Sequence, residues 1–229
     1  MKTAILVDGG FYRRMAQKAK GYVSAEERAE ELENYCHRHL KNHTKKIDYL
    51  YRIFYYDCMP TGDIIYHPYL KEQIDYSKTD LYKWMSIFID ELKKKRKFAL
   101  RLGRLAPKHD KSWFTIKPSS FKKLCNGKKQ FDKLKEDDFN LSIEQKGVDI
   151  KIDIASLAYK KLVDRIVLIS GDSDFVPAAK LARREGIDFI LDPLYNHIPA
   201  DLSEYIDGLR TCDNQYKQDQ VAQENKSDV

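Results

Sequence analysis

The fold is decided by a stretch of eleven residues, Arg165-Ile166-Val167-Leu168-Ile169-Ser170-Gly171-Asp172-Ser173-Asp174-Phe175. Its first part is short, continuous, rich in β-branched residues and followed by Gly, which is typical of a buried strand. The residues from Asp174 to Ala182 have the apolar spacing of a helix. Asp172 and Asp174 are therefore expected on the turn that leaves the C-terminal end of a strand. In open α/β sheets, ligands bind at that edge.

Strands and helices alternate along the rest of the chain. Strands are expected at residues 4–7, 48–56, 98–105, 139–144, 166–170 and 187–191. Helices are expected at residues 11–18, 24–40, 80–95, 147–162, 174–184 and 200–209. Ser24 and Glu27 have the spacing of a capping box, and residues 60–76 are expected to form a loop. The alternation predicts an α/β fold with a mainly parallel central sheet and helices on both faces.

The domain organisation follows from shifts in composition. We expect one domain over residues 1–210, with a basic, lysine-rich insertion at about 107–138 that contains a hairpin around 113–116. Residues 211–229 are polar and rich in Gln, Asp, Asn and Lys, which predicts a flexible tail.

Composition and cysteine usage narrow the class of protein. The 229 residues are 42% hydrophobic and 33% charged, with a net charge of +6. A basic excess favours a polyanionic partner, although a lysine-rich solvated surface explains it equally well. The four cysteines are scattered, which argues against a zinc site or a secreted disulfide scaffold and favours reduced thiols in the cytoplasm. The apolar run 4–7 is too short for a signal peptide, and we expect no membrane span.

Several acidic residues fall where predicted strands end: Asp8, Asp57, Asp172, Asp174 and Asp192. Aspartate is also common in turns and helix caps, and we interpret Asp57 and Asp192 in that way. Crowded carboxylates repel one another unless a cation lies between them, and Mg²⁺ prefers oxygen ligands. Such a cluster suits metal-assisted hydrolysis of a phosphodiester. The chain has neither a Gly-x-Ser-x-Gly nor a Walker A motif that would indicate another chemistry.

Three blocks of the sequence resemble the signatures of the NYN domain family (LabA-like), within the PIN-like nuclease superfamily. The blocks are Ala4-Ile5-Leu6-Val7-Asp8-Gly9-Gly10-Phe11, Lys146-Gly147-Val148-Asp149 and Ser170-Gly171-Asp172-Ser173-Asp174-Phe175. This resemblance implies a PIN-like, three-layer αβα sandwich and a ribonuclease site that uses Mg²⁺ or Mn²⁺. Many family members have Asn three residues after the first Asp, and that position is Phe11 here.

Carried over position by position, the resemblance implies catalytic metal ligands at Asp8, Asp149, Asp172 and Asp174. Asp153, one helical turn after Asp149, is a further candidate ligand or a surface charge. We expect the hydroxyl groups of Ser170 and Ser173 to orient ligands or phosphate.

Basic residues near the acidic site are expected to recruit RNA, and single-stranded RNA is the favoured substrate. The candidates are Lys94, Lys95, Arg96, Arg101, Arg104, Lys122, Lys123, Lys128 and Lys129. The aromatic side chains Trp113, Phe114 and Phe121 can stack on unpaired bases, but a small core within the insertion is the favoured interpretation for them. His37, His39 and His43 are interpreted as histidines on a helix surface.

The leading hypothesis is a metal-dependent ribonuclease. The alternative is a non-catalytic nucleic-acid-binding or regulatory module that keeps the fold, and Phe11 favours it slightly. A phosphatase with an Asp-x-Asp nucleophile would need Thr where Val176 stands. The sequence leaves the oligomeric state open, including a homo-oligomer.

Overall fold

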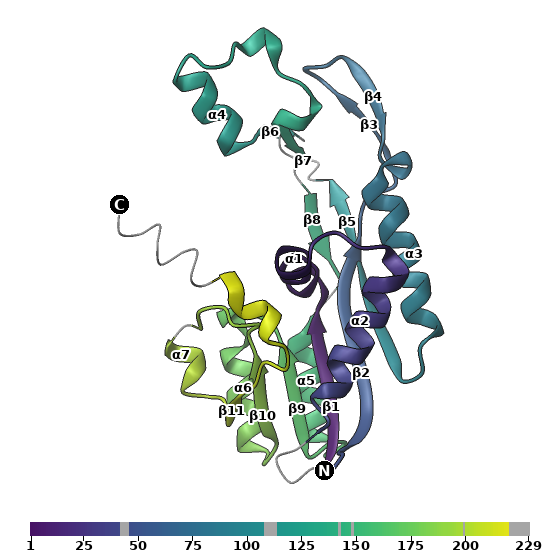
Figure 1. The fold of residues 1–229 in the computed structure, drawn as a ribbon, viewed down its shortest axis with the longest axis vertical. Coiled ribbons are helices and arrows are strands. Elements are labelled where there is room, and N and C mark those ends of the chain that lie inside the picture. Colours follow the sequence, from purple (N-terminus) through teal and green to yellow (C-terminus); the bar gives the residue numbers. More distant parts are fainter. Residues whose placement is uncertain (42–45, 108–113, 142, 148, 199, 220–229) are drawn as a thin grey trace. The chain divides into compact units, whose positions relative to one another are not determined.

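The computed structural model describes residues 1–41, 46–107, 114–141, 143–147, 149–198 and 200–219. Contacts within the chain define two compact units, and Figure 1 shows their elements. Unit 1 comprises residues 1–57, 87–102 and 148–229, and unit 2 comprises residues 58–86 and 103–147.

The central sheet of unit 1 has the strand order β11-β10-β9-β1-β2-β5. Its strands are β1 (Lys2–Asp8), β2 (Tyr49–Met59), β5 (Phe98–Pro107), β9 (Arg165–Ile169), β10 (Asp188–Asp192) and β11 (Gly208–Leu209). β1 is parallel to both β2 and β9, and β10 is parallel to both β9 and β11. The predicted mainly parallel α/β sheet is therefore confirmed.

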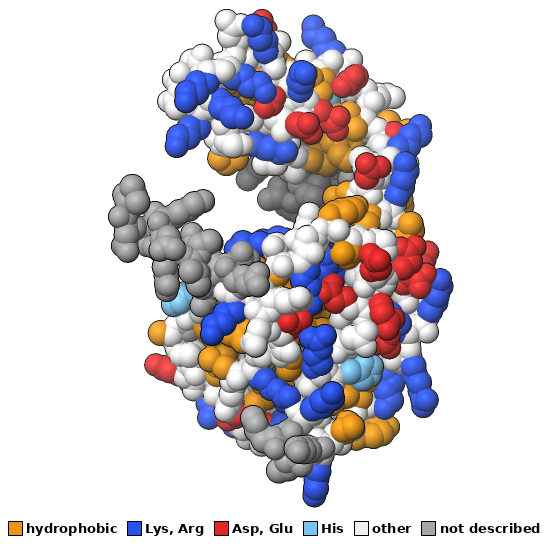
Figure 2. Space-filling model, viewed as in Figure 1, with side chains coloured by type: hydrophobic (Ala, Val, Ile, Leu, Met, Phe, Trp, Pro, Cys, Tyr) orange, Lys and Arg blue, Asp and Glu red, His pale blue; other side chains and the backbone are white. Residues whose placement is uncertain are grey.

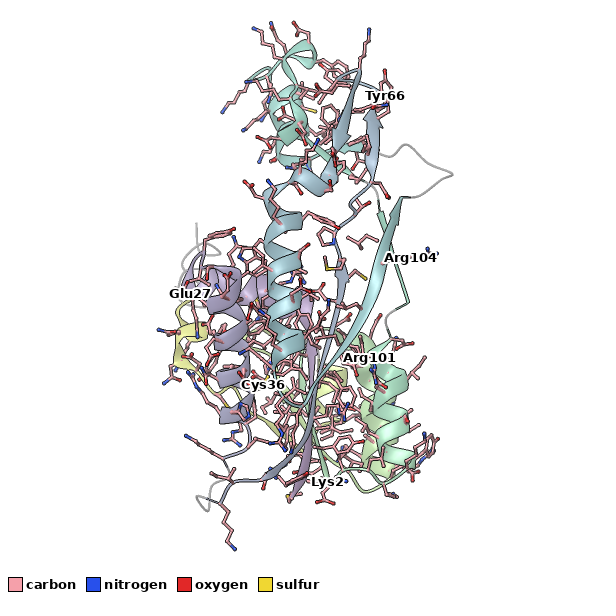
Figure 3. The ribbon with its side chains drawn as sticks, turned by 90° about the vertical axis from the view of Figure 1, so that its right-hand side faces the viewer. Lys2, Glu27, Cys36, Tyr66, Arg101 and Arg104 are labelled. Carbon is pink, nitrogen blue, oxygen red and sulfur yellow. The ribbon has the colours of Figure 1, made fainter. Side chains whose placement is uncertain are left out.

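Helices cover both faces of this sheet: α1 (Gly9–Lys20), α2 (Ala25–Arg38), α3 (Asp80–Lys94), α5 (Ile150–Tyr159), α6 (Val176–Arg184) and the short α7 (Ala200–Ser203). On one face, Tyr55 of β2 makes an edge-on contact with Phe88 of α3, with ring centroids 5.7 Å apart. On the other face, Ala4 and Leu6 of β1 belong to a core cluster with α5 and α6. Figure 3 shows α2, which carries Glu27 and Cys36, on one side of the strands and the green helix α5 on the other.

Burial on both faces explains the sequence of β1. Residues 3–7 of this strand are completely buried, which is the pattern of a central strand in a parallel sheet and the reason for its continuous apolar run. At the start of α2, the hydroxyl of Ser24 accepts a hydrogen bond from the Glu27 amide at 3.1 Å, and the Glu27 carboxylate accepts one from the Ser24 amide at 3.2 Å. This confirms the predicted capping box.

The described residues of unit 2 contain three antiparallel strand pairs, the helix α4 and residues 80–86 of α3. β3 (Ile64–His67) pairs with β4 (Glu72–Asp75), β6 (Phe114–Ile116) pairs with β7 (Phe139–Leu141), and β8 (Ile143–Lys146) pairs with residues 104–107 of β5. α4 (Pro118–Cys125) follows β6, and the short 3-10 helices η1 (Tyr76–Lys78), η2 (Phe131–Lys133) and η3 (Glu136–Asp138) complete the unit. The buried ring of His67 lies 3.9 Å from Phe114 and 4.6 Å from Phe139, measured between centroids.

Two predictions for unit 2 are wrong. Residues 60–76, expected to be a loop, contain the β3–β4 pair, in which Ile65 and His67 are buried while Ile64 and Tyr66 are exposed. This alternation is too short to be recognised as a strand in the sequence, because Pro and Gly residues near it are typical of a loop. The expected hairpin around 113–116 is also not local, because β6 pairs with β7, more than twenty residues later. Residue 113 lies outside the described part of the chain.

The C-terminal region of unit 1 differs from prediction as well. The helix expected at 200–209 ends at Ser203, because residues 207–210 bond to β10 and Gly208 pairs with Ile190. Residues 211–217, expected to begin a flexible tail, instead pack on the helices. Their Tyr216, in the 3-10 helix η5 (Asn214–Asp219), is 1% exposed. No helix in the described ranges is long and apolar enough to cross a membrane.

Candidate active site

A cavity of about 650 Å³ opens at the C-terminal ends of β1 and β9 in unit 1. Val7 and Ile169 are register partners in these parallel strands, so the residues that follow them, Asp8 and Ser170, leave the sheet side by side. The cavity is lined by Asp8, Phe11, Arg14, Met15, Lys18, Ser170, Gly171, Asp172, Asn196 and His197. Parallel neighbouring strands thus bring two of the predicted sequence blocks to one place.

Asp8 is the N-cap of α1 and also faces the cavity. Its Oδ1 accepts a hydrogen bond from the Phe11 amide at 3.0 Å, and its Oδ2 accepts one from the Ser170 hydroxyl at 3.3 Å. Burial raises the pKa of Asp8, although these two hydrogen bonds act in the opposite direction, and the nearby charge of Asp57 raises the pKa further. The carboxylate is therefore short of compensating positive charge.

The turn after β9 holds the two aspartates Asp172 and Asp174. The Asp172 amide donates to the Ser170 hydroxyl at 3.4 Å, and Asp172 Oδ1 accepts from the Asp174 amide at 3.0 Å. The second contact is an Asx turn, which orders the loop before α6. Asp172 lines the cavity, whereas Asp174 does not. The Ser173 side chain lies outside the described part of the structure.

Asp149 lies at the same edge of the sheet, at the start of α5. Its Oδ1 caps the helix by accepting from the Lys151 amide at 2.9 Å. One turn later, Asp153 accepts from the hydroxyl of Tyr56 at 2.8 Å, and Tyr56 is the register partner of Asp8. Asp153 also pairs with Arg101 at 2.9 Å. Its charge is already compensated, which makes it the weakest of the proposed metal ligands.

The donor set fits a hard cation only in part. Two carboxylates and the Ser170 hydroxyl line one cavity, and these are the oxygen donors that Mg²⁺ or Mn²⁺ takes. Within the described ranges, however, no group of three or more His, Cys, Asp or Glu side chains is placed to hold a metal ion. Asp149 and Asp174 are therefore near the edge but not gathered with Asp8 and Asp172.

One face of α1 supplies cavity residues, of which only Phe11 was considered in the sequence analysis. Phe11, Arg14, Met15 and Lys18 are spaced i, i+3, i+4 and i+7, so they lie on the same side of the helix. This spacing, counted from the residue after the Asp8 turn, is the signal that would have revealed them. Arg14 and Lys18 bring positive charge to the lining of the cavity that also holds Asp8 and Asp172.

Both glycines beside the aspartates are required by close packing. A Cβ atom on Gly171 would lie 2.7 Å from Cε2 of Phe11, and one on Gly9 would lie 2.4 Å from the Tyr55 ring. Phe11 is 9% exposed, so its ring is packed on the Gly171 backbone rather than extended into the solvent.

The predicted basic residues Lys94, Lys95 and Arg96 do not lie at this cavity. Lys97 Nζ bonds to the Leu50 carbonyl and lies 4.0 Å from the centre of the Tyr49 ring. Tyr49 pairs with Lys2 at the start of β1. Lys94, Lys95 and Arg96 therefore belong to the opposite edge of the sheet, roughly 20 Å from Asp8 at strand spacing. Lys95 is also paired with two glutamates, at 2.9 and 2.6 Å.

A second basic surface lies on α4 of unit 2, and Figure 2 shows blue side chains gathered there. Between residues 117 and 135 the chain has seven lysines and one acidic residue. Lys122, Lys123 and Lys128 are exposed, whereas Lys129 pairs with Asp138. Phe114 packs on His67, as the small-core interpretation expected. Trp113 lies outside the described residues. We call residues 117–135 the α4 surface.

Exposed aromatic rings accompany the lysines of the α4 surface. Phe121 and Phe131 are each 59% exposed, so the interpretation as a small core is wrong for Phe121. Phe131, which the sequence analysis did not single out, contacts Tyr69 edge-on at 5.2 Å between ring centroids. Arg104, another predicted basic residue of unit 2, is exposed on β5.

The interpretation of His39 as a surface residue is wrong, because it is 1% exposed and bonds to the buried Asp192 at 2.9 Å. His37 is exposed as predicted, and His43 lies outside the described residues. Asp57, interpreted as a turn residue, is also buried, and it forms two hydrogen bonds with Arg13, at 2.8 and 3.1 Å.

Residues 109–207 match the model of the NYN domain. The matched range contains Asp149, Asp172 and Asp174, and Asp8 lies before it. The NYN resemblance is thus confirmed for this range, and the arrangement of sheet and helices is consistent with a PIN-like three-layer sandwich.

Comparison with curated proteins gives no match. Among solved structures, a protein of unknown function from Vibrio parahaemolyticus aligns with 93% of this chain and 94% of its own, at 15% identity and a TM-score of 0.45.

Proposed function

We propose that the protein is a divalent-metal-dependent ribonuclease that hydrolyses single-stranded RNA in the cavity at the ends of β1 and β9. The observation that carries the proposal is the presence of Asp8 and Asp172 in the lining of one cavity, with the Ser170 hydroxyl hydrogen-bonded to Asp8 and to the Asp172 amide. The match of residues 109–207 to the NYN domain supports it, because PIN-like nucleases generally use divalent metals.

Asp8 and Asp172 would hold Mg²⁺ or Mn²⁺, with Asp149 and Asp174 as further ligands from neighbouring turns. Burial raises the pKa of Asp8, so a cation near it stabilises the ionised form. When bound, the ion supplies charge neutralisation at the phosphodiester and lowers the pKa of a water molecule. Ser170 fixes the orientation of Asp8, and Ser173 is the second hydroxyl proposed to orient phosphate.

Arg14 and Lys18 would bind the phosphates that flank the cleaved bond. Both side chains line the cavity from α1, and cationic side chains supply most of the sequence-independent affinity for nucleic acids. Without them, an acidic site would repel its anionic substrate.

The α4 surface would bind the RNA chain independently of the cavity. Lys122, Lys123, Lys128 and Lys129 supply charge, and Phe121 offers an exposed ring on which an unpaired base can stack, at about 1–3 kcal/mol per base. We place the activity in the cytoplasm as part of this proposal, since all four cysteines are unpaired thiols.

The test is the cleavage of a labelled single-stranded RNA with Mn²⁺. Asp172→Asn removes one charge from an exposed side chain, so the fold should persist while cleavage falls to background. Asp90→Asn is the matched control, because Asp90 is also an exposed aspartate, pairs with Lys93 on α3 and does not line the cavity. Equal cleavage by wild type and Asp172→Asn would indicate a contaminating nuclease and would refute the proposal.

The second candidate is a module that binds RNA without cutting it. It is favoured by Phe11, which stands where many NYN proteins have Asn, and by the limited gathering of carboxylates in the described residues. Calorimetry with Mn²⁺ separates the two functions. A nuclease should show saturable metal binding that Asp172→Asn abolishes, whereas a binding module should bind RNA and take up no metal.

A further inference from the structure

Five aromatic rings of unit 2 form a continuous chain of contacts. In order of contact the rings are Phe114, His67, Phe139, Tyr69 and Phe131, and the distances between successive centroids are 3.9, 4.6, 5.2 and 5.2 Å. His67, near one end, is completely buried, whereas Phe131, at the other end, is 59% exposed. The chain of rings therefore connects the core of unit 2 with its surface.

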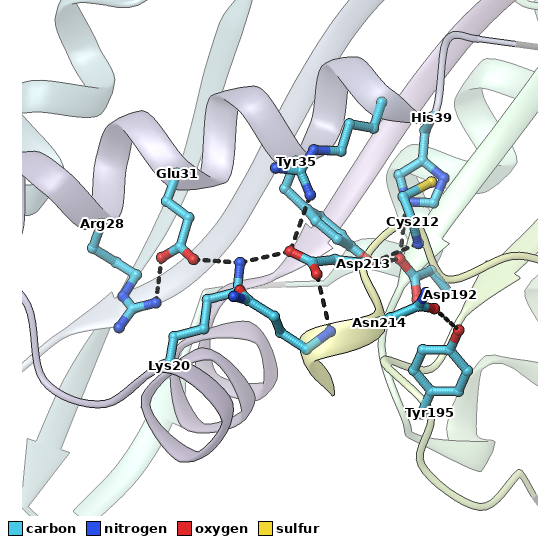
Figure 4. A network of polar contacts seen from close by, with 12 residues as sticks. Lys20, Arg28, Glu31, Tyr35, His39, Asp192, Tyr195, Cys212, Asp213 and Asn214 are labelled. Carbon is cyan, nitrogen blue, oxygen red and sulfur yellow. Dashed lines mark hydrogen bonds and ion pairs between the residues drawn. The ribbon is translucent and has the colours of Figure 1, made fainter. Parts of the chain in front are cut away.

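The ring contacts around Tyr35 in unit 1 are different, because they stay within the core. The Tyr35 ring lies 5.4 Å from that of His39 and 5.6 Å from that of Tyr216, and each of the three residues is 1% exposed. Figure 4 shows Tyr35 and His39 beside Asp192, to which both are hydrogen-bonded. Packing and buried polar contacts explain these rings, but they do not explain an aromatic ring that is left open to solvent.

Phe131 is held in place by Tyr69. The Tyr69 hydroxyl donates to the Phe131 carbonyl, and the two rings are nearly perpendicular, with an angle of 87° between their planes. In a perpendicular pair one ring presents its edge to a face of the other. At least one face of Phe131 is therefore not occupied by Tyr69. The Phe131 carbonyl also accepts from the amide of the buried Leu134, at 3.3 Å.

Asp138 fixes the loop that carries this exposed ring. Its carboxylate accepts hydrogen bonds from the Ser120 hydroxyl at 2.7 Å and from the Lys135 amide at 2.8 Å, and it pairs with Lys129. The Asp138 carbonyl accepts from the Lys117 amide at 2.8 Å. Both ends of the α4 surface are thus tied to one residue, so little ordering of this loop remains to be done when a ligand binds.

Cationic side chains flank Phe131 in the sequence. Lys128 precedes it and Lys133 follows it, both are exposed, and neither pairs with an acidic side chain in the described part of the chain. Asp132 is the one acidic residue between positions 117 and 135. A fixed aromatic face among cations fits a ligand in which flat rings alternate with negative charges. Unpaired bases stack on aromatic side chains, and phosphates bind lysines.

We propose that Phe131 is the stacking platform for an unpaired nucleobase, and that Lys128 and Lys133 bind the phosphates on either side of that base. The faces of paired bases are covered by their neighbours in a double helix, so this site selects single strands. The inference deepens the proposed binding of RNA by the α4 surface and rests on it, but it does not depend on cleavage at the cavity.

The test is the affinity of the full-length protein for a short labelled oligouridylate, measured by fluorescence anisotropy in EDTA so that metal-dependent cleavage does not occur. Phe131→Leu keeps an apolar side chain but removes the aromatic face. Because stacking changes affinity by roughly fivefold or more per base, we expect Kd to rise at least about fivefold. A smaller rise would overturn the proposal.

Phe121→Leu is the matched control. Phe121 is also 59% exposed on the α4 surface, but its ring contacts no other aromatic ring in the described ranges. A base that stacks on Phe121 must therefore also order this side chain, which offsets part of the gain. We expect a smaller rise in Kd than for Phe131→Leu. A rise of equal or greater size would overturn the assignment to Phe131.

An oligomer of the same length without bases gives a further readout. The wild-type protein should bind it at least about fivefold more weakly than oligouridylate, and Phe131→Leu should narrow this difference. An equal difference in both proteins would assign the base contact to another residue.

The salt dependence of Kd distinguishes stacking from a merely structural role of Phe131. Stacking releases no counterions, so the slope of log Kd against log salt should be the same in Phe131→Leu and in wild type. A reduced slope would mean that the substitution displaces the lysines, and it would contradict the proposal. Base-dependent binding without cleavage would refute the nuclease function alone, whereas cleavage with no effect of Phe131→Leu on Kd would refute this site alone.

Discussion

Replacement of Tyr35 by Phe tests whether Asp192 anchors unit 1 as the contacts indicate. Tyr35 is 1% exposed, donates its hydroxyl proton to Asp192, and accepts a hydrogen bond from the Cys212 amide. A hydrogen bond to a charged group contributes about 1.5–3 kcal/mol, and the Cys212 amide loses its acceptor as well. We therefore expect a loss of about 2–4 kcal/mol in the free energy of unfolding. For a chain of this size, that lowers the melting temperature by roughly 5–15 °C.

Tyr12→Phe is the matched control for this variant. Tyr12 is also fully buried and its ring lies 6.4 Å from Tyr35, but its hydroxyl has no hydrogen-bond partner within the described residues. Removing an unpaired buried hydroxyl should leave stability unchanged or raise it slightly. Thermal unfolding followed by circular dichroism measures both variants. If the two melting temperatures fall by the same amount, the network around Asp192 does not contribute the stability argued for it.

Three further predictions concern other parts of the molecule. Gly171→Ala places a Cβ atom 2.7 Å from the Phe11 ring, so it should lower the free energy of unfolding in urea by about 1–3 kcal/mol. In a Phe11→Leu background most of that loss should disappear, and additive effects of the two substitutions would contradict the contact. The pKa of His39 is about 9 in the folded protein and 6.5 in the unfolded chain, so its protonation stabilises the fold by roughly 3 kcal/mol. This stabilisation should be complete below about pH 6.5 and lost as the pH rises through 9. His39→Gln should flatten the dependence of the unfolding free energy on pH. Replacing Lys122 and Lys123 by Ala should reduce the slope of log affinity for single-stranded RNA against log salt by about 1.4 without changing stability; an unchanged slope would exclude the α4 surface from binding.

The part of the candidate site that lies at the ends of strands could be predicted from the sequence. Asp8 and Asp172 follow apolar runs that could only be central strands, and parallel neighbours end at one edge, so their meeting at a cavity was predictable. The cationic residues of the cavity, Arg14 and Lys18, were not predicted, because a long run of Lys and Arg is the stronger sequence signal and it pointed to Lys94, Lys95 and Arg96. Those residues lie at the other end of β2, where their position depends on which way the chain enters the sheet.

The buried polar networks could not be predicted by local patterns. His39 has charged neighbours in the sequence, and Asp192 precedes a proline, so each has the local appearance of a surface or turn residue. They meet across 153 positions of the chain, and their burial depends on how α2 packs against β10 and on the return of residues 211–217. The same holds for Asp57 and Arg13, which pair through the docking of α1 on β2.

The position of Phe11 has a structural reason that bears on the proposed activity. Its amide caps Asp8, and its ring packs against Gly171, so one residue fixes the distance between the turn after β1 and the turn after β9. An Asn there would leave the Gly171 backbone uncovered. Asn196, Arg14 and Lys18 line the same cavity and can supply the polar contacts that an Asn at position 11 would make. The proposed catalysis therefore does not require Asn at position 11, provided that the Phe11 ring keeps the turns that carry Asp8 and Asp172 together.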